Sequence, residues 1–183
     1  MNIEEIVRAL QSHDLERQDS AFKEIVALTA KFAEESVNAL SASASPVLVA
    51  ENIFQLGSAF RPPLERLFYS TSSQELKAIS ASLLAQMGSR VGIEHLLQII
   101  RKGVDYDTLA ATSLAKTGLR DAVPALIERL ENFDRVFYLR RENAPKINTF
   151  LVALKQLGGE LPAHLKKRFT AADVPPDLSR FIE

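Results

Sequence analysis

Three histidines are the first candidates for chemistry in this chain of 183 residues: His13, His95 and His164. None of them has a second histidine, or a triad of carboxylates, at the helical spacing of a metal site. The chain has no cysteine, so disulfides, thiol nucleophiles and thiolate metal ligands are all excluded. We therefore expect neither a metal nor another cofactor.

Catalytic and phosphate-binding motifs are not apparent either. The Gly-Ser-Arg run at 88–90 and the Gly-Gly pair at 158–159 lack the further glycines and the lysine of a phosphate-binding loop. No Gly-x-Ser-x-Gly motif and no Ser-His-Asp arrangement is visible in the sequence. We therefore expect that the protein is not an enzyme.

The best local signal for binding lies in residues 132–143. Aromatic and basic side chains gather there: Arg135, Phe137, Tyr138, Arg140 and Arg141. Residues 134–146 hold four basic and two acidic side chains, a net charge of +2. Tyrosine and arginine are enriched among the residues that dominate protein–protein binding, so we expect these five to contact a partner protein. The alternative is that Val136, Phe137 and Leu139 pack a longer helix and leave a solvated basic face.

The elements that position these side chains are predicted from a sequence repeat with a period of 30 residues. Ala81 aligns with Ala111, Leu84 with Leu114 and Gly88 with Gly118, all within residues 81–130. In each copy an apolar stripe with spacings of three and four ends at a glycine, and a second stripe follows. Such a repeat is typical of stacked helix pairs, because each unit buries its apolar face on its neighbours.

Local signals indicate where the helices begin. Ser72 and Glu75 have the spacing of a capping box, and Asp105 and Asp121 stand where N-caps are expected. Pro124 would fall in the first turn of its helix, where the missing N–H breaks no hydrogen bond.

The spacing of the terminal glycines identifies an insertion. Gly57, Gly88 and Gly118 lie 31 and 30 residues apart, whereas Gly158 follows only after 40. The ten extra residues fall within 132–143, the segment with the arginines and aromatics. Departures from a repeat often map to the binding face.

The repeat resembles the HEAT family, and most closely the phycobilisome-lyase-type HEAT-like repeats. The resemblance lies in ASLLAQMGSRVGIEHLLQII at 81–100 and ATSLAKTGLRDAVPALIERL at 111–130, and it is strongest over residues 73–131. It implies an α-solenoid that usually serves as a protein-binding scaffold, and it brings no catalytic residues with it.

We expect an all-α fold, a right-handed α-solenoid of about five HEAT-like helix pairs in a single domain. Its expected parts are N-terminal capping helices at 1–45, regular repeats at 46–131, the insertion and last repeat at 132–169, and an extended C-terminal tail at 170–183. The first pair lacks a terminal glycine, and terminal repeats are atypical because one of their faces is wetted.

Two relatives of the resembled family suggest other functions. Deoxyhypusine hydroxylase is a HEAT-like enzyme that binds iron through His-Glu pairs, but this chain has only the reverse pair, Glu94-His95. Phycobilin lyase subunits work as two HEAT-like chains together. An accessory subunit of a lyase or modifying enzyme is therefore one alternative function.

Charge bears on the remaining alternatives. The formal net charge of −1 gives no bulk attraction to nucleic acid or to a membrane. The C-terminal half is the more basic one, yet the expected concave face mixes signs: Glu94, Gln98, Arg101, Glu128 and Arg129. A nucleic-acid-binding repeat is the second alternative. No apolar run reaches the length of a membrane span, and the N-terminus lacks a signal-peptide core, so we expect a cytoplasmic protein.

The function we expect is that of a non-enzymatic scaffold or adaptor. It would bind another protein through its concave face and the insertion at 132–143.

Overall fold

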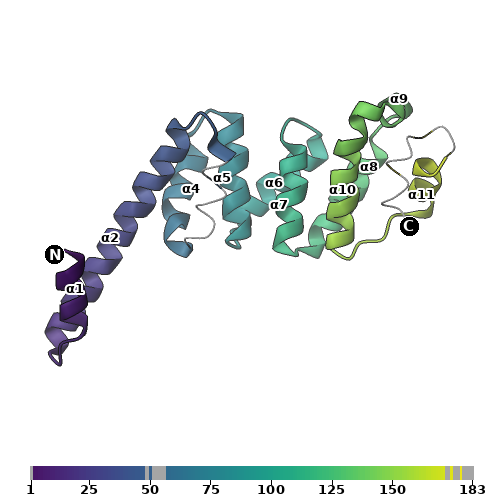
Figure 1. The fold of residues 1–183 in the computed structure, drawn as a ribbon. Helices are drawn as coiled ribbons and strands as arrows, with labels where there is room; N and C mark the ends of the chain where they lie inside the picture. Colours follow the sequence, from purple (N-terminus) through teal and green to yellow (C-terminus); the bar gives the residue numbers. More distant parts are fainter. Residues whose placement is uncertain (1, 48–49, 51–56, 172–173, 175–177, 179–183) are drawn as a thin grey trace. The chain divides into compact units, whose positions relative to one another are not determined.

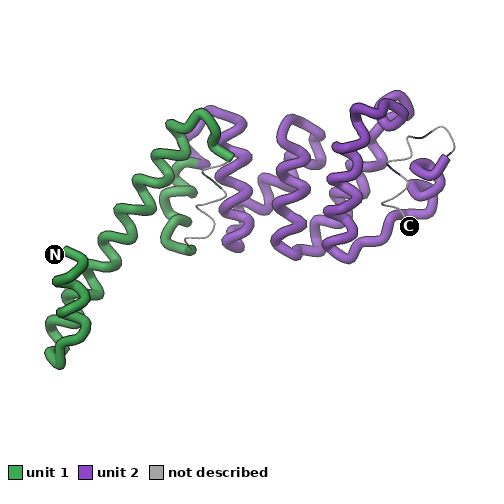
Figure 2. Tube along the Cα trace, in the orientation of Figure 1, with its two compact units in different colours: residues 1–67 green, residues 68–183 purple. Residues whose placement is uncertain are grey.

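The computed structural model describes residues 2–47, 50, 57–171, 174 and 178. Within these ranges all regular structure is helical, which confirms the predicted all-α fold class. The chain divides into two compact units, Met1–Leu67 and Phe68–Glu183 (Figure 2). None of the described helices is both long enough and apolar enough to cross a bilayer. The predicted right-handed solenoid and single domain stay predictions.

The first unit is built on one long helix. Its elements are α1 (Ile3–Leu10), α2 (Leu15–Ala42), the 3-10 turn η2 (Ser58–Phe60) and the start of α4 (Arg61–Ser70). Asn2 and Glu5 form a capping box on α1, and Asp14 accepts hydrogen bonds from the first turn of α2. α1 packs against α2, and η2 packs against the same helix. The helix predicted over 47–56 lies mostly outside the described residues.

The second unit contains the repeat. Its helices are α5 (Gln74–Gln86), α6 (Arg90–Lys102), α7 (Asp107–Thr117), η3 (Arg120–Ala122), α8 (Val123–Glu131), α9 (Arg135–Leu139), η4 (Arg141–Asn143), α10 (Ala144–Gln156) and α11 (Ala163–Phe169). α7 packs between α5 and α10, and α6 packs on α8; α6 also touches α5 and α7, and α10 touches α8 (Figure 1). The helices therefore form two layers.

Leucines at equivalent repeat positions form the core between these layers. Leu84 and Leu114 in the first helices, and Leu96 and Leu126 in the second, have no exposed surface. Each contributes roughly 1.5–3 kcal/mol on burial. The periodicity therefore predicted the core-facing side of each helix correctly.

Glycines end the first helices as predicted. Gly88, Gly118 and Gly158 have φ values of 75°, 69° and 67°, a left-handed conformation that costs little without a Cβ atom. The sequence reading missed a further one, Gly103, which ends α6 with φ 62° and donates its N–H to Ile99 and Ile100.

Three of the predicted helix starts were wrong. The hydroxyl of Ser73, not Ser72, accepts the N–H of Leu76 and caps α5. The chain enters α7 through the left-handed residue Tyr106, so Asp105 caps nothing. Asp121 lies inside η3, because a 3-10 turn precedes α8. Pro124 does occupy the first turn of α8, as predicted.

The C-terminal tail is described at only a few positions. Val174 and Leu178 are buried, and Leu178 is helical. Most of residues 172–183 lie outside the described residues, so the extended tail stays a prediction.

Candidate protein-binding surface on α9 and α11

The insertion folds as two short helical turns held by side-chain hydrogen bonds. Asp134 accepts the N–H of Phe137 at 2.7 Å and so caps α9. The side-chain amide of Asn143, at the end of η4, donates to the carbonyl of Phe137 at 2.8 Å. These bonds close the insertion on itself and fix how its side chains are presented.

Aromatic rings anchor α9 to its neighbours. The Phe137 ring stacks on Phe133 with 4.7 Å between the centroids, and Phe133 lies edge-on to Phe150 of α10. The Tyr138 ring meets Phe169 of α11 edge-on at 5.8 Å. The rings of Phe137 and Tyr138 are half-buried. Phe137 thus packs internally, as the alternative interpretation expected, and Tyr138 packs as well, although that interpretation did not include it.

The arginines of the insertion lie on the outside. Arg135, Arg140 and Arg141 are all exposed, and Val136 is 63% exposed instead of packing. Arg140 lies 3.8 Å from Glu142, an exposed ion pair that contributes little to stability. These charged groups are therefore accessible while the rings beneath them are fixed.

Tyr138 also brings α11 next to α9. The Arg168 guanidinium lies 5.9 Å from the Tyr138 ring centroid and donates to the carbonyl of Glu131 at 3.0 Å. Lys166 and Lys167, on the same helix, are exposed. The sequence indicated only that the C-terminal half is the more basic one. The ring contact between α9 and α11 depends on tertiary packing and left no signal in the sequence.

Together these residues define what we call the α9–α11 surface. Its basic members are Arg135, Arg140, Arg141, Lys166, Lys167 and Arg168. The acidic residues beside them are Glu131, Asp134 and Glu142, and Glu131 already pairs with His164 at 2.9 Å. These residues sum to six basic and three acidic side chains, whereas the whole chain has a net charge of −1. The contacts that join the two helices are those of Tyr138 with Phe169 and Arg168.

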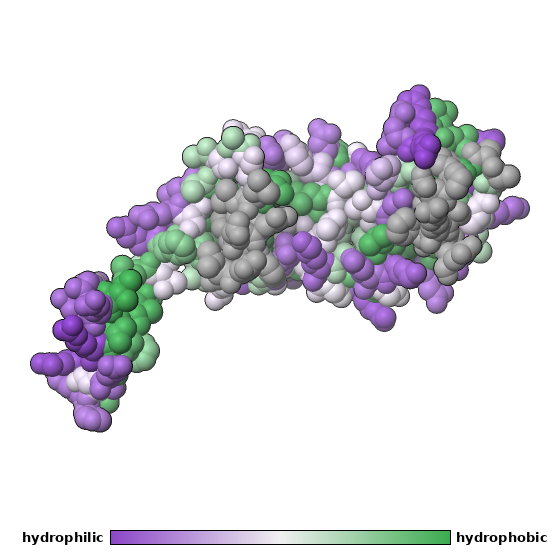
Figure 3. All heavy atoms as spheres, viewed as in Figure 1, coloured by the Kyte–Doolittle hydropathy of each residue, from purple (hydrophilic) through white to green (hydrophobic). Residues whose placement is uncertain are grey.

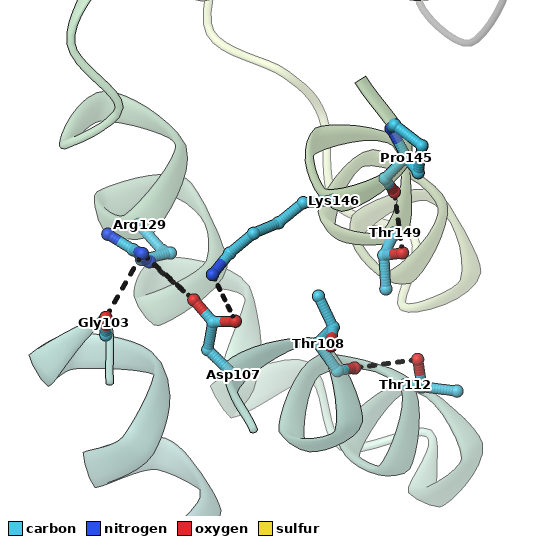
Figure 4. Close-up of polar contacts among 8 residues, drawn as sticks. All are labelled: Gly103, Asp107, Thr108, Thr112, Arg129, Pro145, Lys146 and Thr149. Atoms are coloured by element: carbon cyan, nitrogen blue, oxygen red, sulfur yellow. Dashed lines mark hydrogen bonds and ion pairs between the residues drawn. The ribbon is translucent and has the colours of Figure 1, made fainter. Parts of the chain in front are cut away.

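A buried ion cluster lies between α7, α8 and α10 (Figure 4). Asp107 is only 2% exposed; one of its oxygens accepts from Arg129 at 3.0 and 3.1 Å, and the other pairs with Lys146 at 2.8 Å. Arg129 also donates to the carbonyl of Gly103 and lies over the Phe133 ring. The cluster joins α7, α8 and α10. Through Arg129 it also supports the Phe133 ring, on which Phe137 stacks.

This cluster corrects the sequence-based view of the concave face. Arg129 was expected to contribute charge there, but its side chain is only 15% exposed and is paired with Asp107. Lys146, counted in the charge of the insertion, is directed to the same carboxylate. The two cations stabilise the interior and do not add to a binding face.

His95 lies beside an open pocket. Its ring packs edge-on against Phe68, and burial, then the charges of Lys77 and Lys102, lower its pKa below the ordinary value. It borders an open pocket of about 340 Å³ with Gln98 and Tyr106. Across the described part of the chain, no group of three or more His, Asp or Glu side chains is placed to hold a metal ion.

A further pocket, of about 290 Å³, lies between α7 and α10 and has no charged lining. The hydroxyls of Thr112 and Thr149 at its wall donate to Thr108 and Pro145 in their own helices, as Figure 4 shows. The donor of each hydroxyl is thus already used within its own helix, and only acceptor capacity remains for a ligand.

Comparison of the chain with protein-family models, with curated proteins and with solved structures finds no match.

Proposed function

We propose that this protein is a HEAT-like repeat, a right-handed α-solenoid of about five helix pairs, that acts as a non-catalytic adaptor. It binds an acidic segment of another protein through the α9–α11 surface. The observation that carries the proposal is the contrast within the insertion at 132–143, where the rings of Phe137 and Tyr138 are fixed in packing and the arginines are exposed.

The repeat part of the proposal is supported by the second unit. Its helices alternate between two layers, and its first helices end in left-handed glycines at equivalent positions. These are the features that the repeat pattern predicts for a stack of helix pairs.

The binding part is supported by how the arginines are held. Fixing a flexible surface on binding costs conformational entropy, and a backbone held by Asp134, Asn143 and packed rings avoids part of that cost. A guanidinium group can form two parallel hydrogen bonds to a carboxylate, which lysine cannot do. Acidic side chains of a partner therefore match this surface best.

Nucleic acid is the competing ligand, because phosphates also bind arginine. Asp134 and Glu142 lie among the basic residues, and Arg129 and Lys146 are engaged with Asp107. A continuous track of basic groups is therefore lacking in the described residues, which favours a short acidic peptide.

Fluorescence anisotropy with a glutamate-rich peptide and with duplex DNA, at an ionic strength of about 0.15 M, tests the proposal. Wild type should bind the peptide, and Arg140→Glu/Arg141→Glu should lose at least about tenfold in affinity, or 1.4 kcal/mol. Tyr138 stays unchanged in these variants because its ring packs on Phe169.

The matched control is Arg90→Glu/Lys116→Glu, which makes the same change in charge at two exposed positions away from α9. Equal losses in both variants would reduce the effect to bulk charge and contradict the proposal. Tight DNA binding with a steep dependence on salt, and no peptide binding, would replace it with the nucleic-acid alternative.

A further inference from the structure

Apolar surface that remains exposed takes two forms in the described part of this protein. Along the N-terminal helices it is an open strip, which Figure 3 shows. In the second unit it lines a pocket of about 340 Å³ together with polar groups. A volume of this size lies within the range of small-molecule sites. The pocket therefore has the form of a binding site, and the strip does not.

Two helices and one loop of the second unit form this pocket. Its lining comes from the start of α5, from residues of α6 at spacings of four and three, and from the loop that leads into α7. α5 and α6 pack against each other. The lining residues used below are His95, Ile99 and Lys102 from α6, and Val104, Asp105 and Tyr106 from the loop. The pocket is thus built within the repeat and does not involve α9 or α11.

Two opposite charges at the pocket are not paired within the chain. Lys102 and Asp105 both belong to the lining, and both are exposed. Within the described residues, neither of them forms an ion pair or a side-chain hydrogen bond. Charges of opposite sign at one pocket are complementary to a ligand that carries both charges itself.

The rest of the lining used here is apolar or uncharged. Ile99 is buried, whereas Val104 and Tyr106 are 49% and 37% exposed, which leaves apolar area for a ligand to cover. Burial, followed by the charges of Lys77 and Lys102, lowers the pKa of His95, so its imidazole is uncharged at neutral pH. Apolar walls with a few polar groups are typical of small-ligand sites. The body of a matching ligand is therefore apolar.

The backbone at Tyr106 has a conformation that tyrosine rarely adopts. Its φ is 70° and its ψ is 12°, and among the described residues it is the only one besides glycines with a positive φ. Such a conformation costs free energy and persists where the surrounding structure holds it, often at ligand sites. Tyr106 belongs to the lining of the same pocket. The strained backbone and the unpaired charges are thus two independent observations that point to one site.

We propose that this pocket binds a free α-amino acid with an apolar side chain. Lys102 pairs with the carboxylate of the ligand, and Asp105 pairs with its ammonium group. The apolar side chain of the ligand packs on Ile99, Val104 and Tyr106. The site is independent of the α9–α11 surface, so the failure of one proposal leaves the other intact.

Matched ligands test the two charges separately in an NMR titration of the full chain. The ligands are phenylalanine, leucine, phenylpropanoate, which lacks the ammonium group of phenylalanine, and phenethylamine, which lacks its carboxylate. Phenylalanine or leucine should bind, and phenylpropanoate and phenethylamine should each bind at least about tenfold more weakly than phenylalanine. No binding of either amino acid up to about 10 mM, or equal affinity for phenylalanine and its two analogues, would overturn the proposal.

Two variants assign the charges to their partners. Lys102→Gln should bind phenylalanine no better than phenethylamine, because the carboxylate then has no partner. Asp105→Asn should bind phenylalanine no better than phenylpropanoate, because the ammonium group then has none. Arg140→Glu/Arg141→Glu, which changes only the α9–α11 surface, should bind phenylalanine as wild type does. Variants at Lys102 and Asp105 that keep the full preference for phenylalanine would contradict the proposed roles.

Histidine ring signals in the same titration locate the site. Of the three histidines only His95 lines the pocket, so its ring signals should shift at constant pH, whereas those of His13 and His164 should not. Tyr106→Asn removes the ring but keeps a residue type that tolerates the left-handed conformation. It should bind at least about tenfold more weakly with unchanged helix content by circular dichroism. Unshifted His95 signals, or full affinity in Tyr106→Asn, would exclude this pocket as the site.

Discussion

The two phenylalanines of α2 differ from those of the second unit, although Phe60 of the first unit is buried as well. In the second unit Phe133, Phe150 and Phe169 are buried and hold α9 to α10 and α11. In the first unit Phe22 and Phe32 remain more than half exposed on α2. Helices of 11–13 residues in the repeat are matched in length to their neighbours, whereas α2 outruns α1. The apolar residues of α2 therefore stabilise the fold only where another element lies alongside, as at Ala21, Ala33 and Leu40.

The largest expected effect distinguishes buried from exposed leucine. Leu114→Asp places an unpaired charge among fully buried side chains and should lower the free energy of unfolding by more than about 4 kcal/mol. Leu28→Asp, on the exposed stretch of α2 at residues 26–32, should change that free energy by less than about 1 kcal/mol. Urea unfolding followed by circular dichroism measures both, and equal losses would contradict the comparison.

The next effect compares a buried ion cluster with an exposed pair. Asp107→Ala leaves Arg129 and Lys146 without their shared carboxylate and should cost about 3–5 kcal/mol. Glu94→Ala removes an exposed partner of Arg90 and should cost less than about 1 kcal/mol.

The Asp107→Ala variant should also weaken peptide binding by the α9–α11 surface, since Arg129 supports the Phe133 ring. If Asp107→Ala is less stable but binds the peptide with unchanged affinity, the ion cluster and the α9–α11 surface are independent.

The smallest effect is a dependence on pH. His95 has a folded pKa below 6.5, so the unfolded chain binds the proton more readily as the pH falls below that value. Stability should therefore be unaffected by His95 above pH 6.5 and should decline below it, by at most about 1.4 kcal/mol per pH unit.

Thermal unfolding of wild type and His95→Gln between about pH 7.5 and 5.5 measures this. The variant should show a flatter profile, with His13→Gln, at an exposed position, as the control. Parallel profiles for wild type and His95→Gln would contradict the assignment.

The sequence predicted the repeat well because its signals are local. Period, apolar stripes and terminal glycines at Gly88, Gly118 and Gly158 all follow from neighbouring residues. The helix starts at Ser73 and Tyr106 were missed because short polar residues stand side by side and tertiary contacts select among them. Asp107 illustrates this, since its carboxylate binds Arg129 from 22 residues away.

The candidate site was only partly predictable for the same reason. The five residues of the insertion stood out by type and spacing, but which of them pack and which remain exposed depends on Phe133 and Phe169. The exposed stretch of α2 left no signal of its own, because its apolar residues fit a buried helix face equally well. Sequence alone does not give the length of helix that α1 leaves uncovered.

Hydrogen exchange of the full chain tests the difference between α2 and the second unit most directly. We predict that amides of α7, which packs between α5 and α10, exchange more slowly than those of residues 26–32 of α2, whose side chains are all exposed. Equally slow exchange in both segments would contradict the account, because residues 26–32 would then be covered.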